Sequence, residues 1–306
     1  MRVLFAGASG ILGRALVPQL LAAGHDVIAL TRSPAAADRL TGSGADAVVA
    51  RALDREELLA ALRGIRADAV LHELTALTKP PTRYRAMRMT NALRTLGTAN
   101  LLDAADAVGA TRFVTQSIVF GYGYRAHPAT IDESAPFGEP DGTPVDPTSE
   151  ALAENERRVF ESGLDGIALR YGLFYGGDAE TVRGMLHRRM LPAVAGWNGS
   201  VPLIHHEDAA RATVTALEDG RPGTAYNVAD DDPSQSWASY VDAAAEAWEE
   251  PRPPRVPGAV LRVAAPYAAR LMGGMDLRVA THRIRSLGWT PRYPSAREGW
   301  RAVASR

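Results

Sequence analysis

The chain has 306 residues, a formal net charge of −1 at pH 7 and no cysteine. This length suits one large domain or two closely packed ones. The balanced charge argues against nucleic acid as a partner, and the lack of cysteine excludes disulfides, thiolate nucleophiles and cysteine metal sites. Because there is no apolar run of about 18 residues and the first predicted strand starts at residue 2, we expect no membrane span and no signal peptide. A soluble, cytoplasmic protein is therefore expected.

The first thirteen residues predict a strand, a glycine turn and a helix in immediate succession. A short, largely apolar run at residues 2–6 is typical of a buried strand, and a Gly-x-x-Gly-x-x-Gly sequence follows at Gly7, Gly10 and Gly13. Such glycines let the backbone approach a pyrophosphate, and the N-terminus of the next helix offers free N–H groups and a positive dipole end. The turn therefore predicts a dinucleotide site; the alternative is a turn that only packs helix on strand.

The end of the second predicted strand bears on the choice of cofactor. In NAD-binding folds an acidic residue at this end holds the ribose hydroxyls. In the predicted strand from His25 to Arg32, that place falls on Thr31, and Arg32 follows. A guanidinium presents a planar fork of donors that suits a 2′-phosphate, so the sequence favours NADP(H), with NAD(H) as the alternative. Arg32 could also be a solvated charge, and Arg51, after the third strand, could reinforce a phosphate or face water.

Predicted strands and helices alternate through the first half of the chain. This alternation is typical of an α/β fold with a doubly wound parallel sheet, a Rossmann fold. The further predicted strands are residues 46–50, 69–73, 112–117 and 166–171, and the predicted helices are residues 54–62, 84–108 and 148–162.

Several later segments resemble the motifs of one protein family. Residues 169–177 resemble its Arg-x-x-x-x-Tyr-Gly-Pro-Gly segment, residues 204–210 its His-x-x-Asp-x-Ala element, and residues 287–291 its Leu-Gly-Trp-x-Pro. Together with the glycine spacing at residues 7–13, they identify the chain as similar to the extended short-chain dehydrogenases/reductases, the NAD-dependent epimerase/dehydratase-like family. These motifs are specific for the fold and much less so for the reaction.

The resemblance implies a division of the chain and a set of cofactor contacts. Residues 1–171 with 204–229 would form the NADP-binding Rossmann domain, and residues 172–203 with 230–306 a smaller, mostly helical substrate-binding region. A small-molecule substrate and a homodimer are further family-level expectations. The residues expected at the cofactor are Gly7, Ser9, Gly10, Ile11, Leu12, Thr31, Arg32, Leu53, Leu74, Thr75, Ala76, Tyr171 and Leu173.

The family's usual catalytic pair, Tyr-x-x-x-Lys, does not occur in this sequence. The lysine holds the tyrosine ready to exchange a proton with the substrate oxygen. The single lysine is Lys79, and Thr75 stands four residues before it. When the helix predicted at residues 148–162 is aligned on Glu156, Thr148 and Leu152 stand where the Tyr and the Lys should be. The chain therefore resembles an atypical member of the family. Another residue could supply the proton, the substrate could be activated enough to need none, or the protein could bind cofactor without turnover.

Four residues are candidates for the missing chemistry. Ser117 ends the fifth predicted strand and could touch substrate or cap the strand, although the family's Ser/Thr position, counted back from Gly121, falls on Gln116. Tyr122 and Tyr124 are expected in a flexible loop, as acids whose pKa an arginine such as Arg125 could lower, or as side chains that cover the cleft. Glu73 could be a base near the nicotinamide, or simply solvated or paired.

Other polar groups carry weaker predictions. His205 and His206 are expected on a strand, where adjacent side chains point to opposite faces, so no metal site is predicted. Asp208 is the expected N-cap of the next helix. Three arginines on a predicted helix could bind a substrate diphosphate or face water: Arg183, Arg188 and Arg189.

These features predict an NAD(P)-dependent oxidoreductase for a small carbonyl or alcohol substrate, with secondary metabolism as one setting. Hydride transfer would be the cofactor's chemistry, and the protein would orient the substrate and exclude water. One alternative is a nucleotide-sugar epimerase or dehydratase that retains its cofactor. Another is a non-catalytic NADP(H)-binding sensor.

Overall fold

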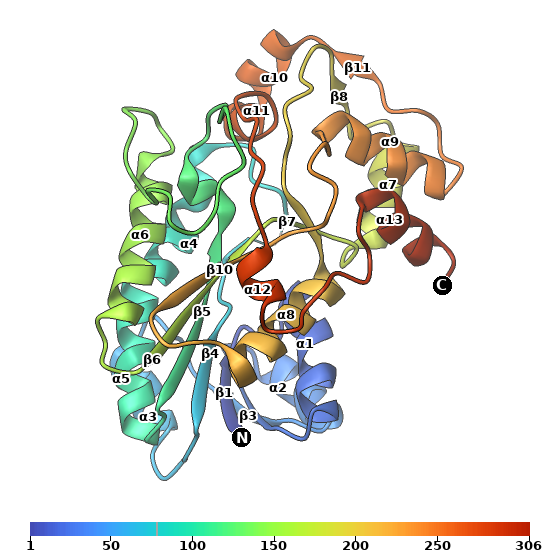
Figure 1. Cartoon of the computed structure of the whole chain (residues 1–306). Coiled ribbons are helices and arrows are strands. Elements are labelled where there is room, and N and C mark those ends of the chain that lie inside the picture. The colour runs from blue at the N-terminus through green and yellow to red at the C-terminus, as the bar shows by residue number, and fades with distance from the viewer. Residues whose placement is uncertain (78) are drawn as a thin grey trace.

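The structure, a computed structural model, describes residues 1–77 and 79–306. Its centre is a seven-stranded parallel sheet with helices on both faces (Figure 1), so the predicted doubly wound α/β fold is confirmed. The strands lie in the order β10 (Thr224–Val228), β6 (Asp165–Tyr171), β5 (Arg112–Ile118), β4 (Ala69–His72), β1 (Arg2–Ala6), β2 (Asp26–Thr31) and β3 (Asp46–Val49).

The order of the strands reverses between β1 and β4. Phe5 of β1 lies opposite Ala29 of β2 on one side and Leu71 of β4 on the other. From β1 the chain builds outward through β2 and β3, then returns to add β4, β5, β6 and β10 on the opposite side. In open parallel sheets the ligand binds at such a switch point, in the crevice outside the carboxyl ends of the strands.

Side chains of the strands alternate between two cores, one on each face of the sheet. Val3 and Phe5 belong to one core, and Leu4 and Ala6 belong to the other, as the two-residue period of a strand requires. The helices that contribute to the first core are α1 (Ile11–Ala22), α2 (Pro34–Gly42), α8 (His206–Asp219) and α12 (His282–Arg285). Those that contribute to the second are α3 (Arg55–Ala61), α5 (Thr98–Val108) and α6 (Asp146–Phe160).

The helix predicted over residues 84–108 is not uniform. It opens with a 3₁₀ turn at Tyr84–Met87, continues as α4 (Arg88–Ala92), and widens to a π-helical turn at Leu93–Gly97 before α5 begins. Gly109, with a left-handed φ of 78°, ends it. Because π-turns are rare and concentrate at functional sites, Leu93–Gly97 is of special interest.

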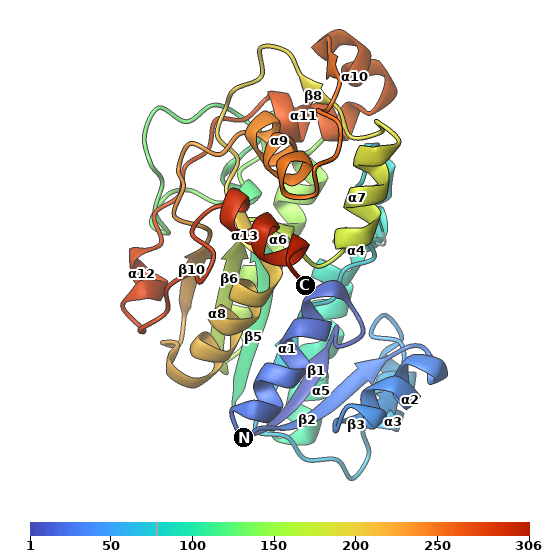
Figure 2. The same ribbon diagram turned by 90° about the vertical axis from the view of Figure 1, so that its right-hand side faces the viewer.

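Apart from α12, which packs against β10, the remaining elements gather beyond the carboxyl edge of the sheet (Figures 1 and 2). Two short parallel pairs, β7 with β9 and β8 with β11, connect helices there, and α9 packs against α13. The two-region division of the chain stays a prediction. No helix in residues 1–77 and 79–306 is long and apolar enough to cross a membrane. These elements are β7 (Leu173–Tyr175), α7 (Ala179–His187), β8 (Ala193–Val194), β9 (Leu203–His205), α9 (Trp237–Ala247), β11 (Arg255–Val256), α10 (Gly258–Ala264), α11 (Pro266–Gly273) and α13 (Ala296–Ala304).

The prediction that Asp208 caps α8 is wrong. The N-cap of α8 is His205, three residues before Asp208. The His205 ring accepts the capping hydrogen bond from the Glu207 N–H. The buried Asp208 carboxylate instead accepts the backbone N–H groups of Arg292 and Tyr293, both at 2.9 Å. Asp208 therefore fastens the segment that follows the Leu-Gly-Trp-x-Pro motif to the sheet domain.

A buried ion pair joins α6 to β6. Arg170 donates from Nη2 to Glu156 Oε2 at 2.7 Å and from Nε to Glu156 Oε1 at 3.0 Å. Ser117 of β5 donates to the same carboxylate at 2.6 Å, and Tyr122 accepts from Arg170 Nη1 at 2.8 Å. The Arg170 guanidinium also lies 3.7 Å from the ring centroid of Phe137. These contacts satisfy both charges in the interior, which is the condition for a buried pair to be tolerated.

Removal of one member of this pair should destabilise the fold strongly. For Arg170→Met we expect a loss of about 3–5 kcal/mol in the free energy of unfolding, because Glu156 is left as an unpaired buried charge. The matched control is Arg157→Met on the exposed side of α6, where Arg157 contacts Glu154 and Glu161. That change should cost at most about 1 kcal/mol. Urea unfolding measures both, and equal losses would contradict the prediction.

Candidate cofactor and substrate site

The glycine turn after β1 lies directly against the end of β4. Gly7 has a φ of 118°, and a Cβ added to it would come 2.8 Å from the backbone carbonyl carbon of Glu73. A Cβ on Gly13 would come 2.2 Å from the backbone oxygen of Ala8. A side chain at either position would therefore force the turn away from the sheet, and these glycines set the shape of the cradle.

The N-terminus of α1 is open to an anion. Gly10 is its N-cap and offers no side-chain acceptor, and the first turn holds no acidic residue. Ser9, Gly10 and Ile11 are exposed. The first N–H groups of an α-helix have no partner within the helix, so this end suits a pyrophosphate. The residues present therefore fit the phosphates of a dinucleotide.

The two arginines near the ends of β2 and β3 differ in their surroundings. Arg32 is exposed beside the buried Thr31, and it makes no side-chain hydrogen bond or ion pair with any residue that the structure describes. Arg51 donates to Glu57 at 2.5 Å and to Asp54 at 2.8 Å. Of these two, Arg32 is the cation without a protein partner in the described part of the chain.

The segment after β4 is held at the same edge of the sheet. Gln116 donates to the Leu74 carbonyl at 3.1 Å, and the Ala76 N–H donates to Thr90 at 3.2 Å, while Thr75 is exposed between them. Leu53 and Leu173 are half-buried. The predicted cofactor residues thus cluster around the carboxyl ends of β1, β2, β4 and β6, or, for Leu53, lie beyond β3; their contacts with a cofactor stay a prediction.

Glu73 is buried beside the glycine turn and is not solvated. It accepts a hydrogen bond from the Tyr171 hydroxyl at 3.1 Å, and Tyr171 also contacts Thr213 at 2.7 Å. Burial raises the pKa of Glu73 from 4.5 to about 8, although the Tyr171 hydrogen bond lowers it. Glu73 is therefore mostly protonated at neutral pH, which does not suit the role of a base.

Ser117 and Gln116 are both committed to protein partners. The completely buried Ser117 hydroxyl donates to Glu156, so it lies in the interior and not at the crevice. Gln116 occupies the family's Ser/Thr position. Its side-chain amide donates to the Leu74 carbonyl, and its backbone carbonyl accepts a hydrogen bond from Asn155 at 2.9 Å. The catalytic role of Ser117 stays a prediction.

The expectation of a loop is wrong for Tyr122, whereas Tyr124 lies in a bend, and both side chains are buried. Tyr122 ends a 3₁₀ helix, Val119–Tyr122, and its hydroxyl donates to Asn227 and accepts from Arg170. Tyr124 is completely buried, with its hydroxyl 3.0 Å from that of Tyr267. Burial raises the pKa of both tyrosines, and for Tyr122 it outweighs the opposing charge of Arg170. Neither is therefore prepared to lose a proton near neutral pH.

The positions aligned with the family's Tyr and Lys carry no ionisable group. Thr148 lies in the first turn of α6, where its hydroxyl accepts from Asn91 at 3.3 Å. Leu152, one turn further along α6, is completely buried.

Two predictions about residues 183–206 are wrong in their geometry. His205 ends β9 but His206 begins α8, so their rings do not diverge and their centroids lie 4.5 Å apart. Of the three arginines placed on one helix, only Arg183 lies on α7; Arg188 follows it as the C-cap, and Arg189 has a left-handed φ of 55°. No group of three or more potential metal ligands was found in the described part of the chain.

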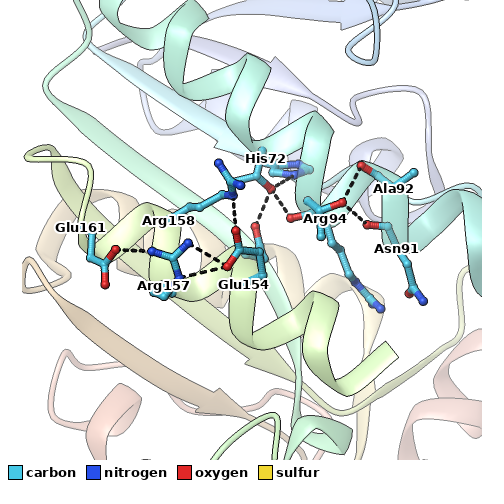
Figure 3. Close-up of polar contacts among 11 residues, drawn as sticks. His72, Asn91, Ala92, Arg94, Glu154, Arg157, Arg158 and Glu161 are labelled. Atoms are coloured by element: carbon cyan, nitrogen blue, oxygen red, sulfur yellow. Dashed lines mark hydrogen bonds and ion pairs between the residues drawn. The ribbon is translucent and has the colours of Figure 1, made fainter. Parts of the chain in front are cut away.

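Two buried groups beside the site, His72 and Arg94, could not be recognised from sequence patterns. His72 forms a hydrogen bond with the Thr98 hydroxyl at 3.1 Å, and Thr98 donates to Asn155 at 2.7 Å. Burial lowers the pKa of His72 to about 4, so the ring is neutral. Arg94, on the π-turn, is also buried, and its side chain points away from His72 (Figure 3). Helical periodicity does not distinguish a buried arginine from a solvated one.

The fold and the glycine cradle together define a dinucleotide-binding α/β protein. The family model described as NAD(P)H-binding matches residues 7–220. The chain belongs to this NAD(P)H-binding family, and its fold is that of the epimerase family of short-chain dehydrogenases/reductases.

Two of the relatives found by sequence are named as reductases. The chain is 39% identical to a 3-diazoavenalumate denitrifying reductase of Streptomyces sp., over 98% of this chain and 99% of the relative. It is 29% identical to a 2-alkyl-3-oxoalkanoate reductase of Stenotrophomonas maltophilia, over 74% of this chain and 68% of the relative. These names support an oxidoreductase role in general.

Similar solved structures support the fold. A UDP-glucose 4-epimerase of Thermotoga maritima with UDP-glucose has a TM-score of 0.81 at 18% identity, covering 100% of this chain and 98% of that one. A human epimerase family protein with NADPH has a TM-score of 0.78 at 21% identity, covering 100% of both chains. A Thermus thermophilus UDP-glucose 4-epimerase with NAD also scores 0.78, at 23% identity, over 100% of this chain and 98% of that one.

The burial of Glu73 has a testable consequence for stability. Because its pKa is higher in the folded protein than in the unfolded chain, Glu73 lowers the free energy of unfolding as pH rises from about 4.5 to 8. Glu73→Gln should therefore gain stability relative to the wild type through this window, by at most about 1.4 kcal/mol per pH unit.

Urea unfolding between pH 5 and 9 measures the difference, in which the other titrating groups largely cancel. Glu150→Gln, at an exposed position of α6, controls for the loss of one carboxylate. A Glu73→Gln difference that does not change with pH would contradict the prediction.

Proposed function

We propose that the protein is an NADPH-dependent reductase of a small organic anion whose reacting group accepts hydride without a proton from the protein. The observation that carries the proposal is the pairing of an intact dinucleotide cradle with Gln116, Thr148 and Leu152 at the positions of the family's catalytic residues. None of the three can exchange a proton near neutral pH. The bound nicotinamide would supply the hydride.

Three of the four candidate residues, Ser117, Tyr122 and Tyr124, do not replace the missing acid. Tyr122 and Tyr124 are buried with raised pKa values, and Ser117 is committed to Glu156. Reduction of an unactivated ketone develops an alkoxide, which a positioned acid usually stabilises by a factor of about 10²–10⁴. A substrate that develops no oxyanion avoids this requirement.

A diazo compound is such a substrate. A diazonium group, R–N₂⁺, that receives a hydride leaves as N₂ and yields R–H, so atoms and charge balance without a proton from the protein. The 39% identical relative is named for the denitrifying reduction of a diazo compound. The compounds in the names of both relatives, a diazoavenalumate and an oxoalkanoate, are carboxylate anions, which supports an anionic substrate here. Secondary metabolism is the corresponding setting.

The preference for NADPH rests on Arg32. Its guanidinium is exposed at the end of β2 and makes no contact with a carboxylate among the described residues, whereas Arg51 is paired with two. Arg32 is thus available for a 2′-phosphate.

Arg32→Ala should weaken NADPH binding by about 10- to 100-fold, the loss expected for a charge-assisted hydrogen-bonded contact, and leave NADH binding unchanged. Titration with each nucleotide, followed by nicotinamide fluorescence, measures both constants. Arg51→Ala is the matched control and should change neither constant by more than about twofold. Equal affinities of the wild type for NADPH and NADH would refute the assignment.

The reaction itself is tested with a carboxylated aryl diazonium salt under excess NADPH. We expect one N₂ released for each NADPH oxidised, above the rate without protein. Tyr122→Phe should change kcat by less than about tenfold, because no acid of the usual 10²–10⁴ effect is lost. NADPH binding reports whether the variant is folded.

Other outcomes would favour the alternatives. Steady reduction of a 3-oxo acid with inert diazonium would move the substrate class to ketones. Cofactor that co-purifies and is regenerated in each cycle would indicate an epimerase or dehydratase. Tight NADPH binding without turnover of any substrate would indicate a sensor.

A further inference from the structure

Arg94 is a buried cation whose charge is not satisfied by any group in the part of the chain that the structure describes. Its residue exposure is 2%, and its Nε and Nη1 atoms are buried without a hydrogen-bond partner in residues 1–77 and 79–306. No ion pair of Arg94 occurs among the described residues. The side chain extends from the π-helical turn away from the His72 contacts (Figure 3). The other buried arginine of the sheet domain, Arg170, has a carboxylate partner.

The surroundings of Arg94 are phenolic and apolar. Burial is the main cause that raises the pKa of both Tyr124 and Tyr267, and the charge of Arg94 acts on each in the opposite direction. The two hydroxyls lie 3.0 Å apart, and both tyrosines belong to one core with Met87 and Val119. Neutral phenols can donate or accept a hydrogen bond but cannot neutralise a guanidinium.

These groups come from separate parts of the chain that meet beyond the carboxyl edge of the sheet. Arg94 follows β4, Tyr124 follows β5, and Tyr267 belongs to α11. The Tyr267 N–H donates to the Thr82 carbonyl at 3.0 Å, which fastens α11 over the segment after β4. Asn91, one turn before Arg94, has a buried Oδ1 atom without a partner in the described residues. Asn91 and Arg94 thus place three buried polar atoms without a partner in the described residues on one helical segment.

An unpaired buried charge costs several kcal/mol, so such a group usually has a partner in the working protein. A guanidinium matches a carboxylate with two parallel hydrogen bonds. We propose that Arg94, flanked by Tyr124 and Tyr267, binds the carboxylate of the substrate. The choice of a carboxylate rests on the proposed function, in which the substrate is a small organic anion. Arg94 would position the substrate and take no part in proton transfer.

The test uses binding, so that it does not depend on turnover. Benzoate and butanoate, with benzamide and butanamide as neutral counterparts, are titrated calorimetrically into the NADPH-bound protein. The wild type should bind the carboxylates at least about tenfold more tightly than the amides, and Arg94→Met should lose that preference. Arg94→Lys should keep part of it, and Arg88→Gln, at an exposed position of α4, should keep all of it.

Thermal unfolding separates a binding role from a structural one. Because Arg94→Met removes an uncompensated charge and preserves most of the volume, the ligand-free variant should melt at or above the wild-type temperature, and carboxylates should no longer raise it. NADPH affinity should be unchanged. A fall of several degrees would overturn the proposal, as would equal binding of acids and amides or retained carboxylate binding in Arg94→Met. If Arg94-dependent binding is found but the diazonium assay fails, the subsite stands and the proposed reaction does not.

Discussion

The contact between the glycine turn and the end of β4 is the constraint on which the site depends. Gly7 passes so close to the Glu73 backbone that a single methyl group would not fit. This approach aims the N-terminus of α1 along the crevice between β1 and β4, where the strand order reverses. It also buries Glu73, whose carboxyl group is kept largely protonated beside a place suited to phosphates. A charged carboxylate there would repel the anion that the turn is shaped to receive.

The two buried arginines differ in whether their charge has a partner. Arg170 is neutralised by Glu156. Ser117 and Tyr122 form hydrogen bonds with this pair, so their hydroxyl groups are not available to donate a proton to a substrate. Arg94 lies among neutral phenols with its Nε and Nη1 unpaired in the described residues. The first arrangement joins β5, α6 and β6 through a pair whose charges are both satisfied. The second indicates where a substrate anion would be held.

The sequence predicted the parallel sheet, the alternation of strands and helices, and the glycine turn with few errors, because these features depend on local patterns. Its errors concern residues whose surroundings come from elsewhere in the chain. Tyr122 and Tyr124 followed a strand in a Gly- and Pro-rich stretch and suggested a loop, but Arg170, Asn227 and Tyr267 enclose them. His205 and His206 suggested a continuous strand, and the start of α8 between them brings the rings together.

What the sequence by itself determined is the dinucleotide-binding α/β fold and the identity of the residues at the cradle. Strand and helix periods, glycine spacing and the single lysine are properties of the chain that need no knowledge of contacts. Only the tertiary structure decided which charges are buried and which have partners. The π-turn that carries Arg94 and the burial that raises the pKa of Glu73 arise where distant segments pack together. The electrostatic cost of a buried group depends on its neighbours in space, and neighbours in sequence do not reveal them.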